Sequence, residues 1–385
     1  MVLPQMEEPG LGREIARERA DWHSLFAPNP SNLVRLPADH TPLLMVVVDT
    51  EAEFDWAKPL SRLATSVRSV RYQVRAHGIF ERYRIIPTYV VDYAVASQPE
   101  GAQPLKELLA DGQCVIGAHL QPWENPPFVE DISDSRNSYP GNLPVEMERE
   151  KLVRLTEAVE ASFHIRPLIY RAGRFGVGPA TARLLVEHGY LIDTSVVPHA
   201  DFTAEGGPDF AQCGVVPYWC GPGARLLEIP LTVGFTGLLR QTGPSFHRVL
   251  TRPGGMRFRL PGVCARLHLL DRVRLSPEGI DIAELIRLTR TLLRCGVRLF
   301  SFTYHSPSMQ PGNLPYVQSD ADLRRFLDRF ERYFDFFFGE VGGRAVTPLG
   351  FRDLALQLAE RLAGQLRRSD GSPAVQGLGR MSSPS

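Results

Sequence analysis

The stretch LLMVVVDTE, residues 43–51, decides the fold. Its six leading apolar residues, half of them β-branched, indicate a strand covered on both faces, as the strands of parallel sheets are. The run then passes into Asp49 and Glu51, and two more carboxylates follow at Glu53 and Asp55. A buried carboxylate costs several kcal/mol unless a cation or hydrogen-bond donors compensate. We therefore expect a positive group beside Asp49.

Short apolar runs of the same kind recur at residues 85–91, 114–119, 168–171, 190–193, 226–230 and 298–304. Segments with helical spacing of apolar residues separate several of them, at 60–76, 145–163, 281–295 and 323–338. Asp281 and Glu284 have the spacing of a capping box at a helix start. Alternating strands and helices require parallel strands joined by helical crossovers. The sequence predicts an α/β fold, either a closed barrel or an open doubly wound sheet.

The alternation is confined to residues 40–365. Residues 1–39 form a polar extension, with a short helix expected over 12–20. Residues 205–280 interrupt the alternation with Gly- and Pro-rich sequence, and we interpret them as an insertion beside the barrel mouth. Its basic stretch, 248–274, is either a solvated surface or a patch that faces an anionic substrate. Residues 366–385, rich in Ser and Gly, are expected to form a disordered tail.

Composition excludes several classes of protein. Of the 385 residues, 43% are hydrophobic and 22% charged, which is typical of a globular chain. Lys plus Arg (43) equal Asp plus Glu (43), so the basic field of a nucleic-acid-binding protein is missing. No apolar run approaches the ~18 residues of a membrane-spanning helix. Because no signal-peptide-like run opens the chain and the five cysteines are scattered, we expect a cytoplasmic protein with free thiols.

Polar side chains stand at the ends of several predicted strands, where catalytic groups of parallel α/β proteins lie. Asp49 and Glu51 end the first strand, His119 the third and His305 the last. Two more strand ends contribute a cation and a carboxylate, Arg171 and Asp193. No glycine-rich phosphate-binding loop follows a strand, which argues against a nucleotide site.

Five short motifs carry a resemblance to a known family: VDTE at 48–51, GAHLQPW at 117–123, RAGRFG at 171–176, YLIDTS at 190–195 and YHS at 304–306. These motifs occur in the order expected for the polysaccharide deacetylase superfamily, also called the NodB-homology or carbohydrate esterase family four fold, and the chain resembles that superfamily. The likeness is strongest to its WalW-like branch, and it spans roughly residues 43–350. The resemblance implies a distorted (β/α)7 barrel that removes an N- or O-acetyl group from a sugar.

The resemblance also implies roles for individual residues. Asp49 would be the general base, Arg171 would keep it ionised and oriented, and His305 would be the general acid. A divalent metal such as zinc would be held by Glu51, His119 and Gln121. Candidate substrate-binding residues are Trp123, Tyr170 and Asp193, and Trp56 could also present an apolar face to a sugar ring.

The chain departs from the family pattern at its metal motif. A second histidine usually follows the first within a few residues, but Gln121 and Trp123 stand in that part of the loop here. An amide oxygen is a weak zinc ligand beside imidazole, so the site holds a metal loosely or holds none.

These observations predict a hydrolase acting on a non-peptide carbon–nitrogen bond or an ester bond of a carbohydrate. The substrate would be a sugar or a nucleotide- or lipid-linked precursor of a surface polysaccharide, with no nucleic-acid partner. Two alternatives remain open: a metal-independent cyclic-amide hydrolase of the same superfamily, and a non-catalytic carbohydrate-binding barrel.

Overall fold

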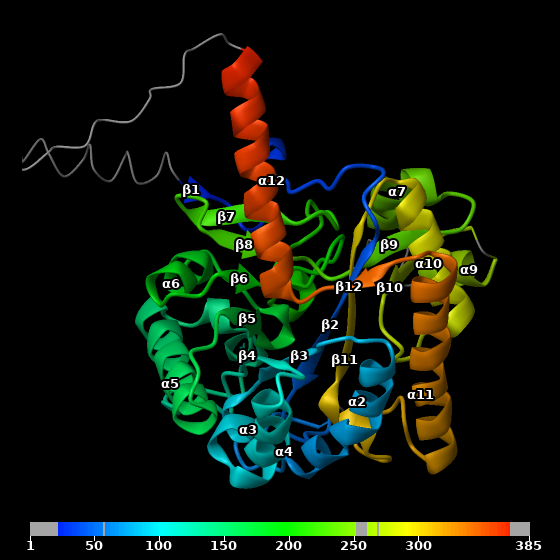
Figure 1. The fold of residues 1–385 in the computed structure, drawn as a ribbon. Coiled ribbons are helices and arrows are strands. Elements are labelled where there is room, and N and C mark those ends of the chain that lie inside the picture. Colours follow the sequence, from blue (N-terminus) through cyan, green and yellow to red (C-terminus); the bar gives the residue numbers. More distant parts are fainter. Residues whose placement is uncertain (1–21, 57, 252–259, 268, 370–385) are drawn as a thin grey trace, which may run out of the picture.

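The computed structural model describes residues 22–369 except residues 57, 252–259 and 268 (Figure 1). The helix expected over residues 12–20 lies outside the described residues. Within them, no helix combines the length and the apolar character that crossing a membrane requires.

Parallel strands form the curled central sheet. In the described part of the chain seven of them follow one another across the sheet: β2 (Leu43–Thr50), β3 (Thr88–Val91), β4 (Val115–Leu120), β5 (Ile169–Ala172), β6 (Ile192–Asp193), β8 (Leu226–Glu228) and β11 (Leu299–His305). Their order across the sheet is β11-β2-β3-β4-β5-β6-β8. Each coincides with a predicted apolar run, and the distorted α/β barrel expected from the sequence is confirmed.

The barrel is distorted because β8 and β11 do not pair with each other. A two-stranded hairpin, β9 (Val233–Thr236) and β10 (Asp271–Arg274), lies between them. Leu275, directly after β10, connects this pair of strands to β11. Its N–H donates to the carbonyl of Thr232, just before β9, at 2.8 Å, and its carbonyl accepts from Thr303 N of β11 at 3.2 Å. Three further short strands extend the sheet: β1 (Trp22–His23), β7 (Tyr218–Pro222) and β12 (Arg344–Ala345).

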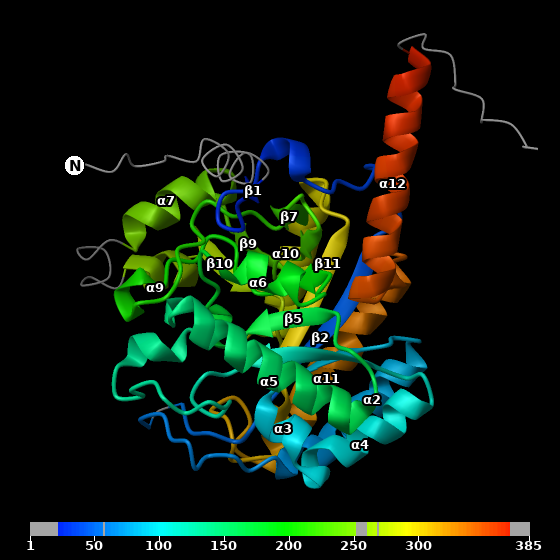
Figure 2. The ribbon, with the colours of Figure 1, turned by 90° about the vertical axis from the view of Figure 1, so that its left-hand side faces the viewer.

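The segment predicted as an insertion, 205–280, needs two corrections. It contains β8, a strand of the central sheet, because the short apolar run at 226–230 pairs in parallel with β6. Its helices, α7 (Gly243–Leu250) and α9 (Leu260–Arg266), do not lie beside the mouth, which is the carboxyl end of the parallel strands. The β9–β10 hairpin carries them toward the opposite end (Figures 1 and 2), while the carboxyl end of β8 and the residues after β10 lie at the mouth.

Helices cover the outside of the sheet (Figure 2). They are α2 (Gln73–Arg82), α3 (Tyr93–Ser97), α4 (Pro99–Ala110), α5 (Val145–Phe163), α6 (Thr181–Glu187), α10 (Ile282–Arg294) and α11 (Asp320–Phe334). The helix predicted over 145–163 is α5, with the same bounds. The α10 helix begins where predicted, because the Asp281 side chain accepts a hydrogen bond from Glu284 N at 3.0 Å. The range 323–338 is covered by α11 and the π-helical turn that follows it, Asp335–Glu340.

The helix predicted over 60–76 is wrong at its start. Residues 60–67 form a loop, a 3-10 turn follows (Arg68–Tyr72), and the α-helix begins only at Gln73. Leu63, expected in the core, is 91% exposed. The loop is held instead by Glu53, whose N–H donates to Ser66 O at 2.7 Å and whose carboxylate accepts from the Ser66 hydroxyl at 2.7 Å. With its carbonyl and its hydroxyl bonded to Glu53, Ser66 does not join the hydrogen-bond pattern of the helix.

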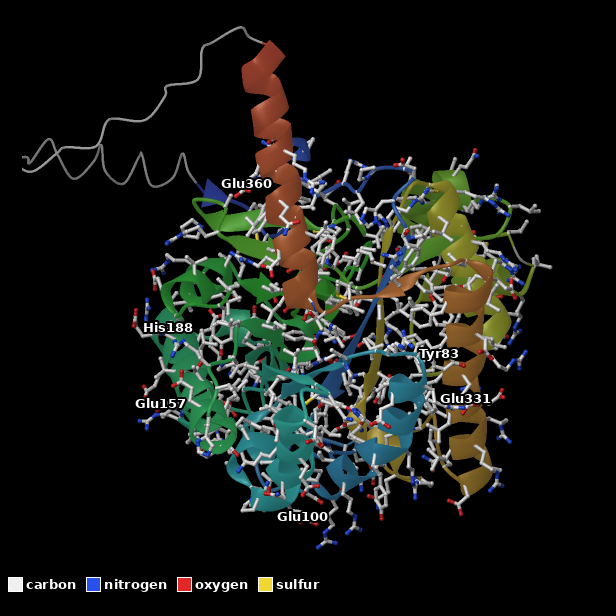
Figure 3. The ribbon with its side chains drawn as sticks, viewed as in Figure 1. Tyr83, Glu100, Glu157, His188, Glu331 and Glu360 are labelled. Carbon is white, nitrogen blue, oxygen red and sulfur yellow. The ribbon has the colours of Figure 1, made fainter. Side chains whose placement is uncertain are left out.

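Aromatic packing joins the last strand to its covering helices. Phe330 of α11 lies 5.1 Å from the Phe302 ring and 5.0 Å from the Tyr304 ring, both of β11. At the surface, the Tyr83 hydroxyl after α2 donates to Glu331 O of α11 at 3.3 Å (Figure 3). The final helix, α12 (Pro348–Ser369), extends away from the body (Figure 2) and includes residues 366–369 of the expected tail.

Candidate active site

Strand register brings four of the predicted site residues to the mouth. In the β2–β11 pair His305 stands opposite Asp49, and in the β4–β5 pair His119 stands opposite Arg171. Each pair lies at the carboxyl end of its strands. The positions therefore follow directly from parallel pairing of strands that end in polar residues.

Asp49 and Arg171 form a buried ion pair. One Arg171 Nη1 donates to Asp49 Oδ1 and, at 3.0 Å, to Thr303 Oγ1, while Nε donates to Thr194 O at 3.0 Å. Burial alone would raise the pKa of Asp49, but the charges of Arg171 and His305 outweigh it and leave this pKa below its ordinary value. Asp49 is therefore a carboxylate, and Arg171 is the positive group that its burial requires.

His305 lies between two carboxylates. Its Nδ1 is 2.8 Å from Glu278 Oε2, and its Nε2 is 3.6 Å from Asp49 Oδ2. Burial would lower the pKa of His305, but Glu278 above all, followed by Glu51 and Asp49, raises it to about 9. The imidazole is consequently protonated at neutral pH, and its Nε2 proton faces Asp49.

Sequence reasoning missed Glu278. This carboxylate is buried and also accepts from His305 N at 2.9 Å and the Ser308 hydroxyl at 2.7 Å. It follows β10, a strand whose sequence, DRVR, lacks the apolar run used to locate the others. The only signal in the sequence is a single acid after Ser276 and Pro277, within the range interpreted as an insertion.

The three predicted metal ligands are also close together, but they bond to one another. His119 Nδ1 is 3.1 Å from Arg171 O, so this nitrogen carries the proton and Nε2 presents a lone pair. Gln121 Nε2 lies 2.8 Å from Glu51 Oε2 and 3.1 Å from His119 Nε2. Since both neighbours are acceptors, the amide nitrogen and not the amide oxygen must face them. The Gln121 NH₂ group thus lies between Glu51 and His119 and donates to both.

This arrangement does not fit a bound divalent metal. A metal needs lone pairs converging on one point, and the amide nitrogen offers protons there instead. Over the described residues no group of three or more His, Cys, Asp and Glu side chains could hold a metal ion. Asp49 is bonded to Arg171, and Trp123, in the part of the loop where a second histidine was expected, packs edge-on against Phe54 at 5.3 Å.

The three predicted substrate-binding residues lie in the interior. Trp123 and Tyr170 are each 1% exposed, and the Tyr170 ring packs edge-on against Tyr190 at 5.8 Å. Asp193 is fully buried beside Glu228, and burial raises its pKa to about 6. None of the three presents its side chain to an open surface. Trp56, by contrast, is 42% exposed, with its ring centroid 4.8 Å from that of His305.

Comparison with known proteins gives structural likenesses only. No model of a protein family matches the chain, and no curated protein does. Among solved structures, one described as a polysaccharide deacetylase from Mycobacterium smegmatis is 17% identical, with 92% of this chain and 99% of that chain covered and a TM-score of 0.47. A structure described as a polysaccharide deacetylase from Pseudomonas aeruginosa PAO1 is 15% identical, covering 81% and 89%, with a TM-score of 0.46. The allantoinase Puue is 16% identical, covering 86% and 97%, with a TM-score of 0.47.

Proposed function

We propose that this protein is a hydrolase that cleaves an acyl group from a sugar by direct attack of water, without a metal. The observation that carries the proposal is the pairing of Asp49 with His305. A carboxylate kept ionised by Arg171 lies 3.6 Å from the Nε2 of an imidazole kept protonated by Glu278. At the same pH, Asp49 is thus deprotonated and can accept a proton, while His305 is protonated and can donate one. General acid–base catalysis needs one group of each kind. The sugar as substrate rests on the motif resemblance.

The chemistry follows from these two groups. Asp49 takes a proton from a water molecule while the water oxygen forms a bond to the acyl carbon. The tetrahedral intermediate collapses as the bond to the leaving nitrogen or oxygen breaks, and His305 Nε2 gives that atom its proton. Transfer of the proton on Asp49 to His305 restores both groups. A protonated His305 with a pKa of about 9 suits an amine leaving group, which needs a proton at neutral pH.

A metal-independent cyclic-amide hydrolase is the second candidate. The observation that favours it is the Gln121 amide, which donates to Glu51 and His119 and so takes up the lone pairs that a metal would use. The same Asp49 and His305 would serve, since opening a cyclic amide needs the same water attack and the same protonation of nitrogen.

The proposal is tested by turnover of N-acetyl and O-acetyl sugars and of cyclic amides, each with and without a chelator. Release of acetate from a sugar by chelated enzyme supports the first candidate, and ring opening supports the second. Binding of sugars with no turnover of any substrate would instead show the non-catalytic barrel.

A further inference from the structure

A cavity of about 420 Å³ lies between the β9–β10 hairpin and α10. The hairpin lines it with Thr236, Gly237, Leu238 and Arg240, from the end of β9 onward, and with Asp271 from the start of β10. No candidate active-site residue is among the lining residues, and the hairpin carries them toward the end of the barrel opposite the mouth (Figure 1). The proposed hydrolysis therefore gives this cavity no role.

The α10 helix lines the cavity with a row of three side chains. Arg287, Thr291 and Arg294 follow one another at intervals of four and three residues, and this spacing places them along one face of the helix. Two guanidinium groups of α10 therefore belong to the same cavity, about two helical turns apart along its length.

Packing fixes the hairpin against α10. A Cβ at Gly234 of β9 would lie 2.9 Å from Leu288 Cδ1 and 3.0 Å from Leu292 Cδ2, so a glycine lets the strand approach the helix this closely. After β9, Arg240 Nη1 donates to Gly237 O at 3.2 Å, which leaves the other N–H groups of this guanidinium for a ligand. The two walls of the cavity are thus held in place by the fold itself.

The lining of the cavity is positively charged. Three arginines, Arg240, Arg287 and Arg294, face a single carboxylate, Asp271. Arg287 is paired with Glu284, three residues before it on α10. Among the residues that the structure describes, Arg240 and Arg294 form no ion pair. The cavity consequently has more positive charge than its own acids neutralise.

A phosphate group is the anion that suits this lining best. Each guanidinium presents its N–H groups in a planar fork that matches phosphate oxygens. Thr236 and Thr291 also line the cavity, and threonine hydroxyls donate to phosphate oxygens in many binding sites. Asp271 repels any anion, but a phosphate has nearly twice the charge of a carboxylate and more oxygens, so several arginines can bond to it together.

We propose that this cavity binds the phosphate group of a ligand, held by Arg240, Arg287 and Arg294. The group belongs either to a soluble phosphate compound or to the head group of a phospholipid. Leu238 lines the cavity and is 75% exposed, so an acyl chain of a lipid would find an apolar contact beside the arginines. The proposal does not depend on the proposed function, because the two sites share no residue.

Titration with inorganic phosphate, followed by ³¹P NMR, tests the soluble source. We expect Arg294→Gln to weaken binding about tenfold, the size of one lost hydrogen bond to a charged group. Asp271→Asn should strengthen binding about threefold, because a repelling charge is removed. Arg324→Gln removes an exposed positive charge on α11, outside the cavity, and should leave binding unchanged.

Sedimentation with vesicles tests the lipid source. Vesicles that contain phosphatidylglycerol are compared with vesicles of phosphatidylcholine alone. If the ligand is a head group, the first kind should bind the wild type and Arg324→Gln, and Arg294→Gln about tenfold more weakly. Leu238→Ala should then weaken vesicle binding while leaving any binding of inorganic phosphate unchanged.

Binding of either probe with this dependence on Arg294 supports the site, and the probe that binds identifies the source. The site is overturned if neither probe binds, if Arg294→Gln binds as well as Arg324→Gln does, or if Asp271→Asn weakens the binding of inorganic phosphate. Because all of these measurements are made without a sugar substrate, their result is independent of whether acyl sugars are hydrolysed.

Discussion

The imidazole of His305, 13% exposed, pairs with the buried carboxylate of Glu278, with Nδ1 2.8 Å from Oε2. Because Glu278 also accepts the backbone N–H of His305, it holds this residue by its ring and by its backbone. With Nδ1 engaged, Nε2 is the nitrogen that faces Asp49. Glu278 therefore acts as a positioning residue that sets both the orientation and the charge of the candidate acid.

Replacing Glu278 should change the pH profile. We expect Glu278→Gln to lower the pKa of His305 from about 9 toward 6.5, because the largest favourable charge beside the imidazole is removed. Turnover requires protonated His305, so the alkaline limb of kcat should move to lower pH by a comparable amount. Glu157→Gln, an exposed position on α5, serves as the control and should leave the profile unchanged. An alkaline limb that stays near pH 9 in Glu278→Gln would show that another group is the acid.

The same pair makes stability depend on pH. His305 has a higher pKa in the folded protein than its ordinary value of 6.5. Its protonation therefore stabilises the fold fully below about pH 6.5, and this contribution is lost as the pH rises through about 9. Urea unfolding at about pH 6, 8 and 10 should show the wild type losing more stability than Glu278→Gln over this range. Equal losses in the two proteins would argue against the pair as the source.

Asp49→Asn tests the base. The amide keeps the shape and an acceptor for Arg171 but cannot take a proton from water, so we expect turnover to fall by about 10²–10⁴-fold. Binding of the sugar product should persist, which separates loss of chemistry from loss of the site. A cooperative thermal transition confirms that the variant is folded. Full turnover in this variant would contradict the role of Asp49.

Much of this site could be predicted because the sequence of a buried parallel strand is a continuous run of apolar residues. The run at 43–48 is followed by Asp49, and equivalent runs end at Arg171 and just before His305, so strand ends alone placed these three side chains together. Glu278 could not be found this way, because it follows β10, whose sequence, DRVR, has a single apolar residue.

Two other features depend on contacts between distant segments and are not visible in the sequence. The direction of the Gln121 amide is set by acceptors on β4 and after β2. The loop at 60–67 has helical spacing of apolar residues, yet its Ser66 bonds through its carbonyl and its hydroxyl to Glu53. Local periodicity misled there because these bonds come from another segment of the chain.

Comparing the wild type with a Gln121 variant tests whether this site can bind a metal ion. We expect chelator to leave turnover unchanged and cobalt to give no tetrahedral absorption band with the wild type, because Glu51 and His119 are bonded to the Gln121 amide. Gln121→His replaces the two amide protons with an imidazole that can turn a lone pair toward the same point. This variant should bind cobalt and show the band. Tight binding of cobalt by the wild type would show that the amide yields its position to a metal.

Lys151 is predicted to hold the loop that follows β4. This lysine on α5 is fully buried, and its Nζ donates to Pro122 O at 2.9 Å and Pro127 O at 2.7 Å and lies 3.1 Å from Glu130 Oε2. Lys151→Met would remove the ammonium group from a buried carboxylate, which keeps Arg62 Nη2 at 3.6 Å from its Oε1, and from several carbonyls, and we expect it to cost about 3–5 kcal/mol of unfolding free energy. Adding Glu130→Gln should restore part of the loss, since a buried carboxylate that has lost its nearest cation is removed. Denaturant unfolding of the single and double variants measures both effects, and a loss below about 1 kcal/mol would mean that the ammonium group contributes little to the loop.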